Sequence, residues 1–188
     1  MAKSSVAVSS LILAFLLLQS HAEAEAGSEN DVASTICPKT RNPVFCESVS
    51  KSAGRLGSPD LKTLATYTLI LFLTKVVDSL KLAKSLAAEA EGTANPQLKE
   101  RYISCSKAYQ QALGDVGKAY KILASGDHNG LNLATSAVTT AVDDCDAEFK
   151  QPPADTSSLP RNGNTLKDLC SIISVMSQLL PGLWRSTQ

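Results

Sequence analysis

Four segments of the chain, from Leu61 onward, carry mainly apolar residues at steps of three or four positions, with a single step of five in the first segment. This spacing places the apolar side chains on one face of an α-helix. Runs of β-branched residues with a period of two, which would indicate strands, are absent from the sequence. The pattern therefore predicts an all-α protein. The predicted stripes are Leu64, Thr68, Leu71, Val76, Leu80, Ala83 and Leu86; then Leu98, Tyr102, Cys105, Tyr109, Ala112, Val116, Tyr120 and Leu123; then Ala134, Val138, Ala141, Cys145 and Phe149; then Leu166, Leu169, Ile173, Met176 and Leu180.

Helix-start and helix-stop signals separate the four segments. A capping residue before a proline begins a helix, and clusters of glycine, asparagine and proline interrupt one. Because the connections are short or of modest length, the helices are predicted to form an up-down-up-down four-helix bundle over residues 58–183. The signals are Ser58-Pro59-Asp60 and Gly92 around the first helix, Asn95-Pro96 before the second, Ser125-Gly126-Asp127 and Asn129-Gly130 as the next turn, Pro152-Pro153 after the third, and Asn164 as the cap of the fourth.

A further helical segment, residues 31–57, precedes the bundle and contains the stretch ICPKTRNPVFC. In this stretch Cys37 and Cys46 enclose Pro38 and Pro43, which punctuate a bend. Two cysteines at this spacing fit a metal site, a redox pair or a structural disulfide. Which of these is expected depends on whether the protein folds in an oxidising or a reducing compartment.

The first 22 residues predict a secretory signal. Lys3 precedes an apolar run from Val6 to Leu18, and Ser20-His21-Ala22 then has small residues where a signal peptidase needs them, so the predicted cleavage lies before Glu23. The run is short for a membrane span, and an N-terminal membrane anchor is the alternative interpretation. The mature chain, residues 23–188, is then expected to be a single domain without a membrane span, in an oxidising compartment.

The charge of the chain is balanced, with 18 Lys and Arg against 18 Asp and Glu. Removal of the predicted signal takes away only Lys3 from this count. A protein that binds nucleic acid needs clustered Lys and Arg to neutralise phosphates. The composition therefore argues against a nucleic-acid partner.

All five cysteines belong to the predicted mature chain, which predicts two disulfides and one free thiol. Cys105 and Cys145 lie on the stripes of neighbouring antiparallel helices, within reach of a disulfide. Cys170 lies beside the stripe of the last helix and is predicted to be a buried free thiol. The mature chain has one histidine and no Cys-x-x-Cys pair, which disfavours a zinc site and redox catalysis. We therefore expect no metal and no other cofactor.

The sequence offers no persuasive catalytic set. His128 would have to serve any Ser-His-Asp or Cys-His arrangement, including a pair with Cys170, but it lies in the predicted turn, where a solvated histidine is expected. Tyr102, Tyr109 and Tyr120 share a helical face and are expected to pack in the core rather than stack on carbohydrate. The chain is therefore predicted to be a binding protein and not an enzyme.

Carboxylates cluster around the fourth cysteine, and paired carboxylates can hydrolyse glycosides when a cleft holds the substrate. An acidic helix end that faces water or a basic partner is the simpler interpretation. A hydrolase that uses this cluster or Cys170 is kept as an alternative. The cluster consists of Asp143, Asp144, Asp146 and Glu148.

Several short motifs follow one another in a specific order, although each is weak alone. After the signal, the short-spaced cysteine pair and a long helix come Cys105-x-x-x-Tyr109-x-x-Ala112, Ser136-Ala137-Val138-Thr139-Thr140, Cys145-x-x-x-Phe149 and Leu169-Cys170-Ser171-Ile172-Ile173. In this order and spacing the chain resembles the plant invertase and pectin methylesterase inhibitor family over essentially the whole mature chain.

The resemblance implies a four-helix bundle with an N-terminal helical hairpin and the disulfides Cys37–Cys46 and Cys105–Cys145. It also implies a stoichiometric inhibitor that docks on a carbohydrate-acting enzyme and covers its substrate cleft. The target would be pectin methylesterase (pectinesterase) or acid invertase (β-fructofuranosidase). A secreted helical bundle that inhibits neither enzyme is the alternative from a different class.

Two features of the sequence favour pectin methylesterase as the target. Invertase inhibitors resemble one another in a Pro-Lys-Phe stretch between the second and third bundle helices, where this chain reads Asp127-His128-Asn129-Gly130. The segment from Ser136 to Thr140 and the Leu169-Cys170-Ser171-Ile172 element resemble those of pectin methylesterase inhibitors, which present helical faces. One departure is Asp144, which replaces a threonine that is common before the fourth cysteine.

The predicted contact surface is the outward polar side of the third bundle helix. The hairpin is expected to extend beyond the bundle and to pack on the target or on another copy, as a homodimer. Secretion to the apoplast, rather than transport to the vacuole, is the predicted destination. The predicted partner-binding residues are Asn132, Thr135, Ser136, Thr139, Thr140 and Asp143.

Overall fold

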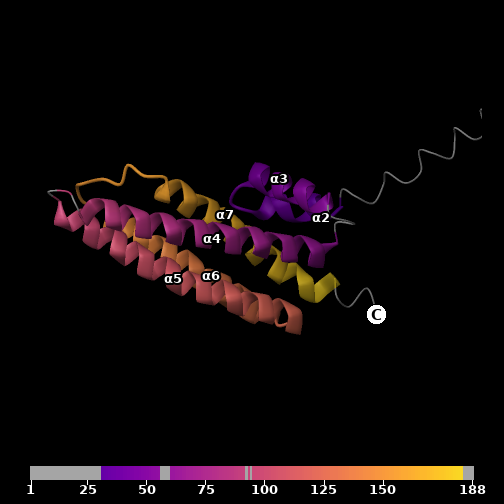
Figure 1. Ribbon diagram of the computed structural model, residues 1–188. Helices are drawn as coiled ribbons and strands as arrows, with labels where there is room; N and C mark the ends of the chain where they lie inside the picture. The colour runs from indigo at the N-terminus through magenta and orange to yellow at the C-terminus, as the bar shows by residue number, and fades with distance from the viewer. Residues whose placement is uncertain (1–30, 56–59, 92, 94, 184–188) are drawn as a thin grey trace, which may run out of the picture. The chain divides into compact units, whose positions relative to one another are not determined.

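The computed structural model describes residues 31–55, 60–91, 93 and 95–183, and within them every regular element is helical (Figure 1). This confirms the predicted all-α class. The predicted signal, residues 1–22, lies outside the described residues, as do Ser58, Pro59 and Gly92. The elements are α2 (Asp31–Ile36), the 3₁₀ helix η1 (Cys37–Lys39), α3 (Pro43–Gly54), α4 (Leu61–Glu91), α5 (Pro96–Ser125), α6 (His128–Glu148) and α7 (Leu159–Leu183).

The four long helices form the predicted up-down-up-down bundle (Figure 1). α5 packs between α4 and α6, and α7 packs between α6 and α4, so each helix has two neighbours. Phe72, Tyr109, Leu131 and Ile173, one from each helix, are fully buried in the core. Of the three tyrosines predicted to pack there, Tyr102 and Tyr109 are buried and Tyr120 is half-buried.

Helix α4 is long and apolar enough to cross a membrane by length and composition alone. Its apolar residues nevertheless include Leu64, Leu69 and Phe72, which are buried against the other helices. A helix at the centre of a protein core has the same composition as a membrane span, so packing gives the better account of α4.

Side-chain caps explain where two of the long helices begin. Asn95 precedes Pro96, and its Oδ1 accepts a hydrogen bond from the Leu98 amide at 3.2 Å, as the sequence predicts for α5. Asp60 Oδ1 likewise accepts from the Thr63 amide at 2.6 Å at the start of α4.

The turn between α5 and α6 is shorter than predicted. Gly126 adopts a left-handed conformation (φ 76°), which glycine tolerates because it has no Cβ, and this residue ends α5. Asp127 then caps α6 by accepting a hydrogen bond from the Gly130 amide at 2.9 Å. The prediction of a turn at residues 129–130 with a solvated His128 is therefore wrong, since His128 is half-buried and begins α6.

Helix α7 begins at Leu159, five positions before its predicted cap. The Leu159 amide donates to Ser157 Oγ at 3.1 Å, and Pro160 fits in the first turn because the amides there have no helical partner. Asn164 is therefore inside the helix, and its predicted capping role is wrong. Its Oδ1 instead accepts a hydrogen bond from Arg41 Nη2 at 3.1 Å.

Residues 31–54 form the predicted helical hairpin, closed by the Cys37–Cys46 disulfide. The prediction that the hairpin extends beyond the bundle is wrong, because α3 packs against α4 and α7 of the same chain (Figure 1). The physical reason is that Ile36, Val49 and Ala53 carry an apolar surface, which they bury in the common core.

The second predicted disulfide, Cys105–Cys145, joins α5 to α6 with a Cα–Cα distance of 4.5 Å. Arg101, one turn before it in α5, holds the connection between α6 and α7. Its guanidinium donates three hydrogen bonds of 2.8–3.1 Å to the carbonyl oxygens of Gln151, Pro152 and Pro153. We call this set of bonds the Arg101 clasp.

Candidate functional site

A groove of about 430 Å³ runs between α6 and α7, and we call it the α6–α7 groove. Most of its polar lining consists of hydroxyl groups, because serine and threonine recur on the facing sides of both helices. Arg41, from the connection between η1 and α3, also lines it. The lining residues on the two helices are Thr135, Ser136 and Thr139 on α6, and Lys167, Cys170, Ser171 and Ser174 on α7.

The predicted contact residues of α6 lie at or beside this groove. Ser136 and Thr139 line it, and Thr140 is exposed one turn beyond Ser136. Asn132 is half-buried and Asp143 is exposed. The α6 part of the predicted surface is therefore accessible to a partner at these five positions.

Thr135 is the exception, because only 1% of its surface is exposed. Its Oγ1 donates to the carbonyl oxygens of Leu131 and Asn132, at 3.0 and 3.1 Å. Leu131, Thr135 and Val138 share the buried stripe of α6, which begins one turn earlier than predicted. The prediction that Thr135 points outward is therefore wrong.

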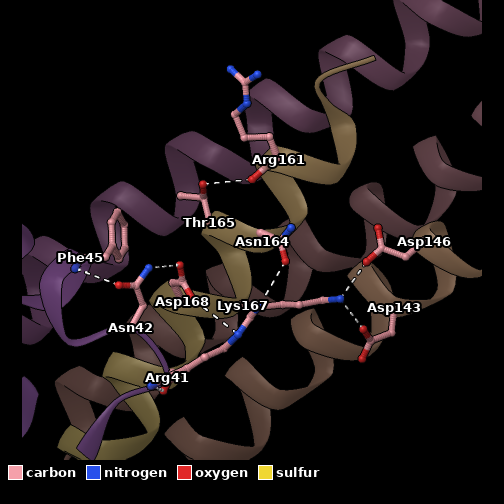
Figure 2. Close-up of polar contacts among 11 residues, drawn as sticks. Arg41, Asn42, Phe45, Asp143, Asp146, Arg161, Asn164, Thr165, Lys167 and Asp168 are labelled. Carbon is pink, nitrogen blue, oxygen red and sulfur yellow. Dashed lines mark hydrogen bonds and ion pairs between the residues drawn. The ribbon is translucent and has the colours of Figure 1, made fainter. Parts of the chain in front are cut away.

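Lys167 of α7 forms ion pairs with two of the four carboxylates in the acidic cluster of α6 (Figure 2). Its Nζ lies 2.6 Å from Asp143 Oδ1 and 2.7 Å from Asp146 Oδ2, so both carboxylates are paired with a residue of α7. Burial alone would lower the pKa of Lys167, but the hydrogen bonds and charges of the two aspartates outweigh burial and raise this pKa. Lys167 is therefore a charged link between α6 and α7.

The remaining carboxylates of the cluster have different surroundings. Glu148 Oε1 accepts a hydrogen bond from Ser104 Oγ of α5 at 2.6 Å. Asp144, which directly precedes the fourth cysteine, is exposed. Asp144 therefore faces solvent, as does Asp143, which is also paired with Lys167.

Cys170 is the predicted buried free thiol, and the structure confirms this. Its Sγ donates to the carbonyl oxygen of Thr135 at 3.3 Å. Burial raises the pKa of Cys170 to about 12, so the reactive thiolate is scarce near neutral pH. The residue thus helps to join α7 to α6 and is a poor nucleophile.

Several residues of this face are not among those predicted from the sequence. Leu133 of α6 is 74% exposed although it is a large apolar residue. Leu133 does not share the helical face of Leu131 and Val138, which is buried. An apolar residue off the buried face of a helix can be recognised from the sequence alone, so the sequence could have indicated this position. By contrast, Arg41 and Lys167 are distant in sequence from α6, and only the fold brings them to the groove.

The comparisons with known proteins agree with this architecture. The plant invertase/pectin methylesterase inhibitor family matches the chain over residues 31–176. The chain belongs to this family. The match covers the hairpin, all of α6 and the groove-lining part of α7, so the resemblance inferred from the motifs is confirmed.

Relatives within the plant invertase/pectin methylesterase inhibitor family are similar over nearly their whole length. The chain is 36% identical to a pectinesterase inhibitor of Actinidia deliciosa over 179 residues, which are 95% of each chain. It is 37% identical to pectinesterase inhibitor 1 of Arabidopsis thaliana, over 90% of this chain and 92% of that protein.

A solved structure in the same family shows the same fold. A crystal structure of mutant form A of a pectin methylesterase inhibitor from Arabidopsis superposes with a TM-score of 0.70 at 36% identity. The superposition covers 79% of this chain and 97% of the other.

Proposed function

We propose that the chain is an inhibitor of pectin methylesterase that binds the enzyme in a stoichiometric complex. The observation that carries this proposal is that both relatives described above are pectinesterase inhibitors, at 36–37% identity over at least 90% of this chain. The protein acts by binding and has no catalytic role of its own. The side of the bundle that contains the α6–α7 groove and the exposed residues of α6, which we call the α6–α7 face, covers the substrate cleft of the enzyme.

The physical properties of the α6–α7 face support this role. A stable complex of standard size buries about 800 Å² on each partner, which one side of a four-helix bundle can supply. Binding is stronger when the surface is already ordered, because less conformational entropy is lost. The Cys105–Cys145 disulfide and the ion pairs of Lys167 hold α6 in place between its two neighbours.

The contact residues that we propose on α6 combine hydroxyl, amide and carboxylate groups around one apolar side chain. Such a mixed surface suits a polar enzyme cleft, where hydrogen bonds give orientation and an apolar anchor contributes affinity. Leu133 would be the anchor, since it is exposed at the same helix. The polar residues are Asn132, Ser136, Thr139, Thr140 and Asp143.

The protein is proposed to act outside the cell, in the apoplast. The support is the predicted signal of residues 1–22, with cleavage before Glu23. A homodimer through the hairpin stays a prediction. Because the hairpin buries its apolar side against α4 and α7, a dimer would have to use its outer side, where Val44 is 77% exposed.

Titration of purified residues 23–188 against a plant pectin methylesterase tests the proposal, with an acid invertase assayed in parallel. We expect pectin methylesterase activity to fall to a plateau near one inhibitor per enzyme, and invertase activity to stay constant. Loss of invertase activity alone would show that the target is wrong. If neither activity changes at micromolar concentrations, the chain is a non-inhibitory bundle.

A further inference from the structure

The disulfide loop of the hairpin contributes a side chain to the α6–α7 groove. Arg41 lies between Cys37 and Cys46, and it lines the groove together with Ser136 and Thr139 of α6. Its side chain is 47% exposed, so a partner that covers the groove would also meet the guanidinium. The hairpin and α6 therefore border the same hollow, although they are far apart in sequence.

Three contacts with α7 fix the position of Arg41 (Figure 2). Its backbone amide donates to Ser171 Oγ at 2.8 Å, and its Nη2 donates to Asn164 Oδ1 at 3.1 Å. Its Nε lies 3.6 Å from Asp168 Oδ1. Both the backbone and the guanidinium are thus held on one side, toward α7.

Asp168 is itself held by the hairpin, which reinforces this arrangement. Asn42 Nδ2 donates to Asp168 Oδ2 at 3.0 Å, and Asn42 Oδ1 caps α3 by accepting from the Phe45 amide at 3.2 Å (Figure 2). The cap of α3, the carboxylate and the guanidinium therefore form one connected set of bonds. Arg41 is ordered before a partner binds, which reduces the entropy that binding would remove.

The guanidinium keeps hydrogen-bonding capacity for a partner. Arginine carries five N–H donors in a planar fork, and Nη1 of Arg41 has no hydrogen-bond partner in the part of the chain that the structure describes. Lys167, the other cation of the groove, is paired with Asp143 and Asp146 at 2.6 and 2.7 Å. The free side of Arg41 is therefore the cationic donor site that the groove offers.

We propose that Arg41 is a specificity-determining contact for the target enzyme, in which its guanidinium binds a carboxylate at the rim of the pectin methylesterase cleft. This inference rests on the proposed function. An arginine fork matches a carboxylate better than any other side chain does, and charge-assisted bonds of this kind are among the strong ones at interfaces. The hairpin and the α6–α7 face then bind the enzyme as one surface.

Four variants of the mature chain test this contact by the Kd for a pectin methylesterase. We expect Arg41→Ala and Arg41→Gln to raise Kd by about 10- to 30-fold, as for truncation of an interface arginine, and Arg41→Lys to raise it less because the charge remains. Arg161→Ala is the matched control, because Arg161 is an exposed arginine of α7 that does not line the groove. It should change Kd by less than about twofold.

Two further measurements separate contact from support of the fold. Arg41→Gln and Arg41→Lys keep hydrogen-bond donors, so their melting temperatures should stay close to that of the wild type and report on folding. The dependence of Kd on salt should be weaker in Arg41→Gln than in wild type, since a salt-sensitive charge pair is missing. A purely structural role of Arg41 would leave the salt dependence unchanged.

The outcomes distinguish this inference from the function on which it rests. If wild type inhibits and Arg41→Ala keeps the wild-type Kd, the Arg41 contact is refuted while the inhibitor function stands. Equal losses in Arg41→Ala and Arg161→Ala would also refute it, because they indicate general charge attraction. Wild-type binding by Arg41→Gln would exclude a carboxylate partner. If wild type does not inhibit pectin methylesterase, both proposals fall.

Discussion

Helix α6 makes two different contacts, one with α5 and one with α7. Toward α5, the Cys105–Cys145 disulfide joins buried residues, and the rings of Tyr102 and Phe149 lie 5.2 Å apart. Toward α7, the same helix opens into a groove with hydroxyl groups and the ion pairs of Lys167. The contact with α5 is covalent and closely packed, whereas the contact with α7 leaves an open groove whose polar groups are mainly hydroxyls. The difference suggests that the first contact mainly stabilises the fold, and we propose that the second is available for recognition.

Removing the covalent contact should have the largest effect on stability. In the chain-entropy description, a disulfide that closes a longer loop stabilises more, because it restricts the unfolded chain more strongly. Replacing both cysteines of Cys105–Cys145, with a sequence separation of 40, by alanine should lower the free energy of unfolding by about 4 kcal/mol. Denaturant unfolding measures this change.

The hairpin disulfide provides the matched control for that experiment. Cys37 and Cys46 are separated by only 9 positions, so their replacement by alanine should cost about 2.5–3 kcal/mol. A larger loss for the hairpin pair than for the Cys105–Cys145 pair would contradict the assignment of stability to the α5 side of α6.

The contact between α6 and α7 depends on a close approach at Gly163. A Cβ added at Gly163 would lie 2.9 Å from Cγ1 of Val142, and valine is stiff because it is β-branched. Gly163→Ala should therefore lower the free energy of unfolding by about 1–3 kcal/mol, as overpacking does. Thermal unfolding and denaturant titration both report it.

Gly117 of α5 is the control for Gly163, because a Cβ there would meet nothing within 4 Å. Gly117→Ala should raise the free energy of unfolding by about 0.5–1 kcal/mol, since alanine favours a helix and restricts the unfolded chain. If both variants raise the free energy of unfolding, helix propensity and not packing between α6 and α7 governs the site.

The polar side of α6 should affect binding without affecting stability. Leu133 is 74% exposed, so Leu133→Ala should leave the melting temperature nearly unchanged and raise the Kd for pectin methylesterase by about 5- to 30-fold, the equivalent of about 1–2 kcal/mol. Ile70→Ala, at a residue 47% exposed on α4, is the matched control and should bind as wild type. Equal losses would show that Leu133 is not part of the interface.

Alkaline pH should produce the smallest effect, by acting on buried groups on both sides of α6. Burial raises the pKa of Cys170 to about 12, and burial together with the hydrogen bond to Asp155 raises the pKa of Tyr102 to about 12. The folded state therefore favours the protonated forms. This contribution is complete below the ordinary pKa values, about 8.5 for Cys and 10 for Tyr, and is lost as the pH rises toward 12.

Melting temperatures measured between about pH 8 and 12 should consequently fall, with the steepest decrease above about pH 10. In the Cys170→Ala variant the melting temperature should fall less with rising pH, because the contribution of the thiol is absent. In native wild type at pH 8, Cys170 should react with a thiol reagent only after unfolding. Rapid reaction of the folded protein would contradict the burial of this thiol.

The sequence predicts the fold better than it predicts the site. The apolar stripes locate all four bundle helices because buried positions recur about once per turn along each helix. Cys105 and Cys145 form a disulfide because both lie on such stripes. The errors concern single positions. Asn164 looks like a cap, but local bonds of Ser157 begin α7 earlier, and Asn164 is used by Arg41.

The site is harder to predict because it is assembled from distant segments. Thr135 is polar and therefore resembles a surface residue, yet its hydroxyl is satisfied within its own helix and it packs in the core. No pattern in the sequence around Arg41 or Lys167 indicates that these residues lie near Ser136 in the fold. The packing of the hairpin on α7 places Arg41 there, and that packing depends on tertiary bonds to Ser171.

The Arg101 clasp has a consequence for how the bundle opens. The clasp, the Cys105–Cys145 disulfide and the bond from Tyr102 to Asp155 all fasten α5 and α6 near one end, where the connection to α7 begins. The opposite end is the tight turn at Gly126, where capping bonds hold the backbone and neither of the two disulfides lies. Local opening should start at this turn, so amide protons near it should exchange with solvent first and those beside the disulfide last.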